Sequence, residues 1–208
     1  MFDYLRDPAA IYRQSFRIIE AEAGLERLPA DIASVARRMI HACGMTDLVD
    51  DLAFSPGAGV IGRAALAAGA SVICDVRMAA AGVLQDRFPA GNAVLTGLDQ
   101  PDTDRLAEEK ATTRSAAGMD ALRDRLGGAV VLIGNAPTAL FRLLELVAEG
   151  AAGPALVLGF PVGFVGAVES KAALAESDLP FITLHGRRGG SAIAAAALNA
   201  LLFEDSRP

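Results

Sequence analysis

Three consecutive units with one pattern make up the last third of the chain and restrict its fold more than any other feature. Each unit is an apolar run, then a loop of small residues, then a stretch typical of a helix. The apolar runs are residues 129–133, 155–158 and 181–184. Continuous apolar strands that alternate with helices are typical of a parallel sheet covered on both faces. The repeat predicts an α/β fold in which ligands bind at the carboxyl ends of the strands.

Earlier parts of the chain are expected to add strands and a helical N-terminus to this sheet. The additional strands are expected at residues 52–54, 71–74 and 93–95. Asp7-Pro8 is a good start for a first helix, and a second helix is expected from Asp31 to Gly44. We therefore expect an open, mainly parallel sheet with helices on both faces and N-terminal helices. A single domain should span residues 1–208.

Charge and cysteine content limit the partners of this chain and its location. The formal net charge of −6 gives no general attraction to nucleic acid or to an anionic membrane, so neither is expected as a partner. Cys43 and Cys74 have neither metal-ligand spacing nor a secreted disulfide pattern. The N-terminus does not resemble a signal peptide, and no apolar segment has membrane-spanning length. We expect a soluble cytoplasmic protein.

The residues from Arg37 to Gly44 look like the last turns of the second helix and include one of only two histidines in the chain. An apolar stripe at helical spacing marks the buried side of this helix and consists of Ile32, Val35, Ala36, Met39, Ile40 and Cys43. At about 100° per residue, His41 lies on the opposite side, with Ser34 and Arg38. Two interpretations stay open: a solvated histidine at the negative end of the helix dipole, or a proton carrier beside anion-binding arginines.

Several other polar residues have both a structural and a functional interpretation. Ser15 lies on the apolar side of the first helix, so its hydroxyl either bonds back to a carbonyl or belongs to a site. Asp75 and Arg77 follow a strand and either face a ligand or pair with one another. Arg114 stands at a helix start, where a cation gains nothing from the helix dipole, so it needs another partner.

The loops after the strands supply main-chain N–H groups at helix starts, where anions bind. No loop has G-x-G-x-x-G after a strand or a Walker lysine motif, so a nucleotide site has only weak support. Metal-ligand clusters and nucleophile motifs are also absent from the sequence. What remains is general acid–base chemistry by His41 or His185 on a carboxylated substrate.

A set of short motifs occurs together and in order along nearly the whole chain. The set comprises residues 38–44 (RMIHACG), 133–140 (IGNAPTAL), 159–165 (GFPVGFV), 169–171 (ESK) and 189–191 (GGS). It resembles the precorrin-8X methylmutase family, the corrin-ring isomerases of vitamin B12 biosynthesis. The resemblance implies a 1,5-shift of a methyl group from C11 to C12 of precorrin-8X, which gives hydrogenobyrinate. It also implies a homodimer that holds the substrate near the subunit interface, with no cofactor and no metal.

The resemblance further implies roles for individual residues. His41 matches the family's catalytic histidine and is expected to be the proton donor or acceptor. Substrate-contacting positions of the family fall on Ser15, Arg38, Arg114, Asn135 and Lys171. A methyl migration needs no nucleophile or redox centre, and a substrate with many carboxylates suits arginines and helix N-termini. His185 matches no obligatory histidine and is left out of catalysis.

Three alternatives stay open beside this hypothesis. One is the cobalt-containing version of the same isomerase, although residues 41–44 resemble the cobalt-free branch more closely. Another is a non-catalytic corrin carrier on the same fold, which would bind corrins tightly without turnover. The third is a nucleotide-binding α/β enzyme, which nucleotide titration would reveal.

Overall fold

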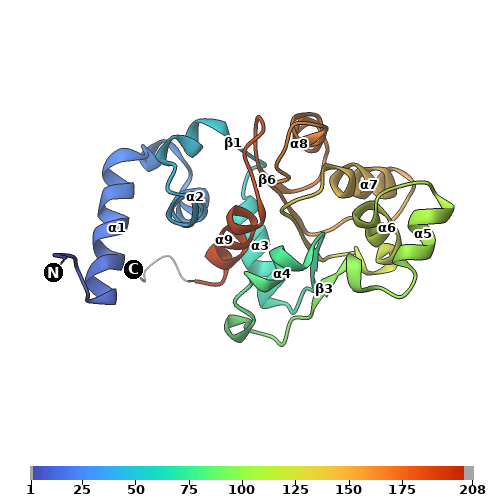
Figure 1. Cartoon of the computed structure of the whole chain (residues 1–208), viewed down its shortest axis with the longest axis horizontal. Helices are drawn as coiled ribbons and strands as arrows, with labels where there is room; N and C mark the ends of the chain where they lie inside the picture. Colours follow the sequence, from blue (N-terminus) through green and yellow to red (C-terminus); the bar gives the residue numbers. More distant parts are fainter. Residues whose placement is uncertain (1, 204–208) are drawn as a thin grey trace.

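An open six-stranded sheet carries the fold of the computed structural model, which describes residues 2–203 (Figure 1). The strand order is β1-β6-β5-β4-β2-β3, and the strands are β1 (Leu52–Phe54), β2 (Val72–Cys74), β3 (Val94–Thr96), β4 (Val130–Ile133), β5 (Leu156–Gly159) and β6 (Phe181–Leu184). Neighbouring strands pair in parallel except β1, which runs antiparallel to β6 at one edge. The expectation of an open, mainly parallel sheet is confirmed.

Helices cover both faces of the sheet, because its strands are apolar on both sides. The α-helices are α1 (Pro8–Glu22), α2 (Ala30–Cys43), α3 (Ala58–Ala67), α4 (Arg77–Ala81), α5 (Thr103–Glu109), α6 (Arg114–Ala121), α7 (Pro137–Ala148), α8 (Ala167–Ala175) and α9 (Ser191–Leu201). In β4, Val130 and Leu132 join the core with α3, α4 and α9, whereas Val131 and Ile133 join the core with α6, α7 and α8. Within residues 2–203, no helix is both long and apolar enough to cross a membrane.

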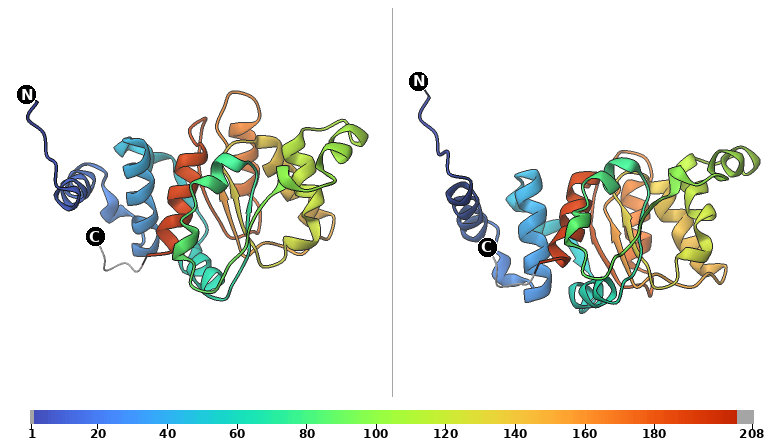
Figure 2. Two further views of the ribbon diagram at one scale, coloured as in Figure 1. Left: turned by 60° about the horizontal axis from the view of Figure 1, so that its bottom comes forward. Right: turned by 90° about the horizontal axis from the view of Figure 1, so that it is seen from below.

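The two N-terminal helices form a further layer outside the sheet and its covering helices. α2 packs against α9, and α1 lies on the outer side of α2 (Figure 2). The apolar side of α2 is buried at Ile32, Val35, Ala36, Met39 and Ile40. Asp7 caps α1 by accepting hydrogen bonds from the N–H groups of Ala9 and Ala10, each at 3.2 Å. Gly44 ends α2 with a φ of 73°. Both helix boundaries agree with the sequence-based expectation.

The last turn of α2 lies at the carboxyl edge of the parallel strands. A 3₁₀ segment, η2 (Thr46–Asp51), leads from α2 into β1. The first residue of β1, Leu52, pairs with Leu184 at the carboxyl end of β6. The N–H of His185 then donates to the carbonyl oxygen of Asp51 at 2.7 Å. The connection therefore brings the end of α2 to the edge where ligands are expected.

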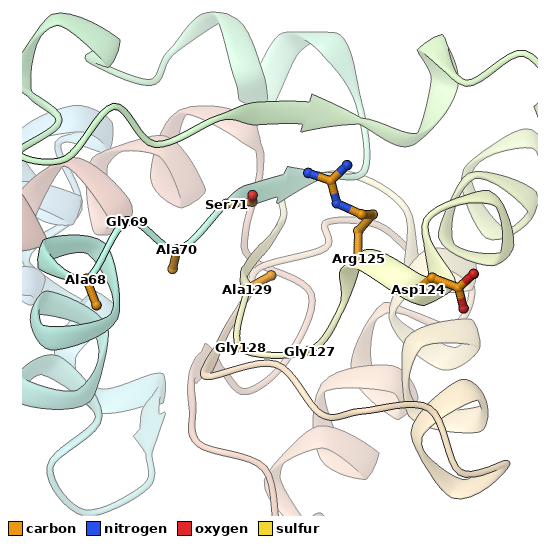
Figure 3. A pocket seen from close by; sticks show the side chains of 9 residues that line it. All are labelled: Ala68, Gly69, Ala70, Ser71, Asp124, Arg125, Gly127, Gly128 and Ala129. Atoms are coloured by element: carbon orange, nitrogen blue, oxygen red, sulfur yellow. The ribbon is translucent and has the colours of Figure 1, made fainter.

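The opposite, amino-terminal edge of the sheet holds a polar cavity of about 300 Å³ at the starts of β2 and β4 (Figure 3). Its lining consists of residues 68–71, 124, 125 and 127–129. Arg125 reaches across the side of the cavity near Ser71 (Figure 3). None of the site residues expected from the sequence lines this cavity, so a site built from them lies elsewhere.

Gly189 allows the loop after β6 to pass directly against the loop after β5. A Cβ atom at this position would collide with the carbonyl oxygens of Phe160 and Pro161. The next residue, Gly190, donates its N–H to the Phe160 oxygen at 2.8 Å. These atoms are main chain, which cannot move aside as the tip of a side chain can. The contact fixes the spacing of two loops at the carboxyl edge.

We expect Gly189→Ala to destabilise the chain by about 1–3 kcal/mol, because the methyl group overpacks against main chain. Urea unfolding followed by circular dichroism measures the change. Gly153→Ala is the matched control, since that glycine is exposed and its Cβ would meet only the Leu179 side chain, at 3.4 Å. Equal unfolding midpoints for the two variants would contradict the packing argument.

Candidate functional site

The imidazole of His41 is held by a hydroxyl from α1. Ser15 Oγ lies 2.9 Å from His41 Nδ1. No other hydrogen bond to this ring occurs within the described part of the chain, and His41 is exposed. A neutral imidazole has one donor and one acceptor nitrogen, so fixing Nδ1 leaves Nε2 for a ligand. The interpretation of Ser15 as a hydroxyl bonded back to a carbonyl is wrong, because its partner is the histidine.

Two aromatic side chains of α1 enclose the same imidazole. The Phe16 ring stacks on it, with centroids 5.1 Å apart and an interplanar angle of 18°. The Tyr12 ring approaches at 5.5 Å and 67°, an edge contact. Tyr12, Ser15 and Phe16 share one face of α1, because positions i, i+3 and i+4 of a helix are neighbours. That face of α1 sets both the position and the orientation of His41.

Of the two neighbouring arginines on α2, one is paired and the other keeps its charge available. Arg37 lies 3.5 Å from the Glu20 carboxylate of α1. Arg38 donates to the hydroxyl of Tyr12 at 3.0 Å, and its guanidinium lies 3.8 Å from the centroid of the Phe203 ring. None of the carboxylates in residues 2–203 pairs with Arg38. No carboxylate of this part of the chain therefore neutralises the positive charge of Arg38 beside His41, as an anion-binding group requires.

At the carboxyl ends of β2 and β4, a buried carboxylate holds the loop that displays Asn135. Asp75 accepts the N–H groups of Gly134 at 3.0 Å, Asn135 at 2.9 Å and Ala136 at 2.7 Å. Burial raises the pKa of the Asp75 carboxyl, while these main-chain donors act in the opposite direction. Asp75 and Arg77 do not pair with one another. Both Asp75 oxygens bind main-chain N–H groups of this loop. The Asn135 residue on the same loop is exposed at the edge of the sheet.

Arg114 begins α6 beside the start of α7. Thr113 caps α6 by accepting the N–H of Ala116 at 3.2 Å, and its hydroxyl also lies 2.7 Å from that of Thr138 in α7. Arg114 pairs with Asp104 of α5 at 2.6 Å, and both side chains are more than half exposed. This exposed ion pair answers the need for a partner, and it is weak enough for a ligand carboxylate to replace Asp104.

Lys171 has no exposed surface and contacts main chain. Its Nζ donates to the carbonyl oxygen of Arg188 at 2.6 Å, which joins α8 to the loop after β6. Burial lowers the pKa of this amine to about 8. The Arg188 side chain binds Asp47 and Asp51 of η2, and His185 is exposed. A direct substrate contact for Lys171 stays a prediction.

The site residues expected from the sequence form two groups at different ends of the molecule. His41, Ser15 and Arg38 lie together on α1 and α2, whereas Asn135 and Arg114 lie at the starts of α7 and α6 (Figure 1). All three views place α1 and α6 at opposite ends of the long axis (Figures 1 and 2). Sequence reasoning missed Tyr12, Phe16 and Phe203 as neighbours of the first group. The spacing of Tyr12, Ser15 and Phe16 was the available signal.

Comparison with known proteins covers nearly the whole chain. A family model described as precorrin-8X methylmutase matches residues 10–204. The precorrin-8X methylmutase of Pseudomonas aeruginosa is 59% identical over 98% of this chain and 99% of its own length. That of Sinorhizobium sp is 54% identical over 96% of both, and a cobalt-precorrin-8 methylmutase of Priestia megaterium is 37% identical over 93% and 87%. The crystal structure of the Thermus thermophilus precorrin-8x methyl mutase superposes with a TM-score of 0.83 at 42% identity, covering 93% of this chain and 96% of that one.

The buried lysine predicts a pH dependence of stability. Between the folded pKa of about 8 and the unfolded pKa of about 10.4, the unfolded chain binds more protons. Lys171 should therefore make the free energy of unfolding rise as pH rises from about 8 to about 9, by at most about 1.4 kcal/mol per pH unit. Above pH 9 the buried Cys74 thiol, whose pKa burial raises to about 12, acts in the opposite direction, so the test is confined to the lower part of the window.

Urea unfolding at several pH values measures this rise, and Lys171→Met should remove it because methionine does not titrate. Lys110→Met is the control, since Lys110 is the only other lysine in the sequence and its side chain is 44% exposed. It should keep the rise. A Lys171→Met variant with the wild-type pH dependence would show that Lys171 is not the group responsible.

Proposed function

The chain belongs to the precorrin-8X methylmutase family and is an isomerase, and we propose that it moves a methyl group from C11 to C12 of precorrin-8X to give hydrogenobyrinate. The single observation that best supports a role in this reaction for particular residues is the exposed His41 with Nδ1 bound by Ser15 and Arg38 beside it. The identity to relatives named for the metal-free substrate is 54–59%, against 34–37% for those named for cobalt-precorrin-8. These identities support precorrin-8X as the substrate over its cobalt form.

His41 acts in this proposal as the proton donor and acceptor. A methyl shift around a conjugated ring needs a proton placed or removed to lower the barrier, and a positioned histidine is well suited to this. Ser15 holds Nδ1 and so directs Nε2 towards the macrocycle. The stacked Phe16 ring restrains the imidazole plane, so the proton is exchanged at one fixed place.

The remaining site residues bind the substrate's acetate and propionate groups. Arg38 and Arg114 are suited to carboxylates because a guanidinium offers parallel N–H donors. Asn135 lies exposed on the loop held by Asp75 and offers an amide to the same polar periphery. Lys171 completes the predicted set. The reaction as proposed uses no cofactor and no metal.

We further propose that the enzyme is a homodimer whose active site is shared between subunits. Support comes from the separation of the two residue groups, which lie at opposite ends of a single protomer (Figure 1). Large apolar side chains are also exposed on α1 and on the loop after β5, among them Ile11, Ile18, Phe164 and Val165. Exposed apolar surface of this kind is typical of subunit interfaces. In a symmetric dimer, α1 and α2 of one subunit meet the sheet edge of the other.

We place this homodimer in the cytoplasm, with residues 1–208 as one functional domain. Cys43 and Cys74 are both free thiols, which suits a reducing compartment. The family match over residues 10–204 supports one domain across these residues.

Replacing His41 with alanine should lower kcat by about 10²–10⁴-fold and leave hydrogenobyrinate binding nearly unchanged. Conversion is followed by the absorption change of precorrin-8X, and binding by calorimetry. His185→Ala, which changes the only other histidine, should keep full activity. Full activity of His41→Ala would remove His41 from the mechanism, and a wild-type protein that binds without turnover would be a corrin carrier.

The shared site predicts complementation between two inactive variants. If each active site takes His41 from one subunit and Arg114 from the other, mixed dimers of His41→Ala and Arg114→Ala contain one intact site. Dissociating and reassociating an equal mixture should restore roughly a quarter of wild-type activity, because half of random dimers are mixed. Each variant alone serves as the control. No recovery in a mixture whose mixed dimers are verified by mass spectrometry would place both residues in the same site of one subunit.

A further inference from the structure

Tyr12 touches both functional groups of α2 at once. Its hydroxyl accepts a hydrogen bond from Arg38 at 3.0 Å. The edge of its ring meets the imidazole of His41, with centroids 5.5 Å apart. Its ring also packs on Phe16, at 4.4 Å and 59°. Because Arg38 and His41 are three residues apart on α2, a single side chain from α1 reaches both of them.

Within residues 2–203, the groups that fix the guanidinium of Arg38 are uncharged. The Tyr12 hydroxyl binds one nitrogen, and the Phe203 ring, at the end of α9, covers a face of the guanidinium at 3.8 Å. In contrast, Arg37 and Arg114 each pair with a carboxylate. An arginine held by a phenol and a phenyl ring keeps its orientation without losing its charge to an internal anion. An incoming carboxylate then has no carboxylate of residues 2–203 to displace from Arg38.

Fixing an arginine before the ligand arrives strengthens binding. A free arginine side chain loses rotamer freedom on binding, at a cost of order 1 kcal/mol. A hydrogen bond to a charged donor such as Arg38 is also stronger than a neutral one. Both effects make the Tyr12 hydroxyl relevant to substrate affinity, although it contacts Arg38 and not the substrate.

We propose that Tyr12 is a positioning residue that holds the carboxylate clamp Arg38 through its hydroxyl and the proton carrier His41 through its ring. This role rests on the function proposed above for Arg38 and His41. Tyr12 divides the two tasks between two parts of one side chain. Removing the hydroxyl affects substrate binding alone, whereas removing the ring affects the chemical step as well.

Tyr12→Phe removes only the hydroxyl and tests the first task. We expect KM for precorrin-8X and the Kd for hydrogenobyrinate each to rise about tenfold, with kcat unchanged. Tyr4→Phe is the matched control, because Tyr4 is the only other tyrosine in the sequence, is 64% exposed and has Arg6 over its ring. It should behave as the wild type. A Tyr12→Phe variant with wild-type KM and Kd would overturn the proposal.

A double-mutant cycle shows whether the hydroxyl acts through Arg38. In an Arg38→Ala background, adding Tyr12→Phe should produce no further loss of hydrogenobyrinate affinity. A further tenfold loss would mean that Tyr12 binds the ligand by itself, which contradicts a positioning role. Unchanged hydrogen-exchange protection of α1 in the Tyr12→Phe and Tyr4→Phe proteins verifies that α1 stays folded on α2.

Tyr12→Leu removes the ring and tests the second task. This variant should lower kcat about tenfold beyond the KM effect, and it should shift the NMR signal of His41 while the His185 signal stays in place. An unchanged kcat would mean that Tyr12 positions Arg38 but not His41, and it would overturn the proposed role of the ring. If wild-type protein fails to convert precorrin-8X, the proposed function fails; the Kd measurements still decide the role of Tyr12.

Discussion

The burial of both faces of a parallel sheet is the constraint from which the rest of this structure follows. Strands such as β4 alternate side chains between two cores, so helices must cover each face. Parallel strands also gather the following loops at one edge, and there Asp75 holds the Asn135 loop through three main-chain N–H groups. The sheet therefore provides a rigid edge for Asn135, while α1 and α2 hold the histidine at the other end of the protomer (Figure 1).

The main features of this fold were predictable because they depend on local patterns. Apolar runs such as residues 129–133 identify strands, and Asp7-Pro8 and Gly44 mark helix ends through cap geometry. The antiparallel pairing of β1 had no such signal, since the register of Leu52 with Leu184 depends on how η2 returns the chain. Tertiary connections of this kind do not appear in the periodicity of a sequence.

For the site, the sequence predicted which residues lie on the polar face of α2, but it did not predict the partners that the site residues contact. A helical wheel placed His41 and Arg38 on one polar face, and the structure has them exposed and half-buried there. Ser15 was assigned to the apolar side of α1, but its partner proved to be the imidazole, and Arg77 pairs with Asp99 instead of Asp75. Each of these contacts joins residues distant in sequence, so only the packing of α1 on α2 and of β2 beside β3 determines them.

The outer position of α1 determines under which conditions the site around His41 stays assembled. Only Phe16 and Ile19 of this helix are buried, yet it supplies Tyr12 and Ser15 to the imidazole. Elements with few buried contacts open at a lower free energy than the whole domain unfolds. In a separated protomer, heating or dilute denaturant would accordingly release α1 while the sheet stays intact. The lifetime of the site would then be that of its most peripheral helix, and a partner subunit that covers α1, as proposed above, would lengthen it.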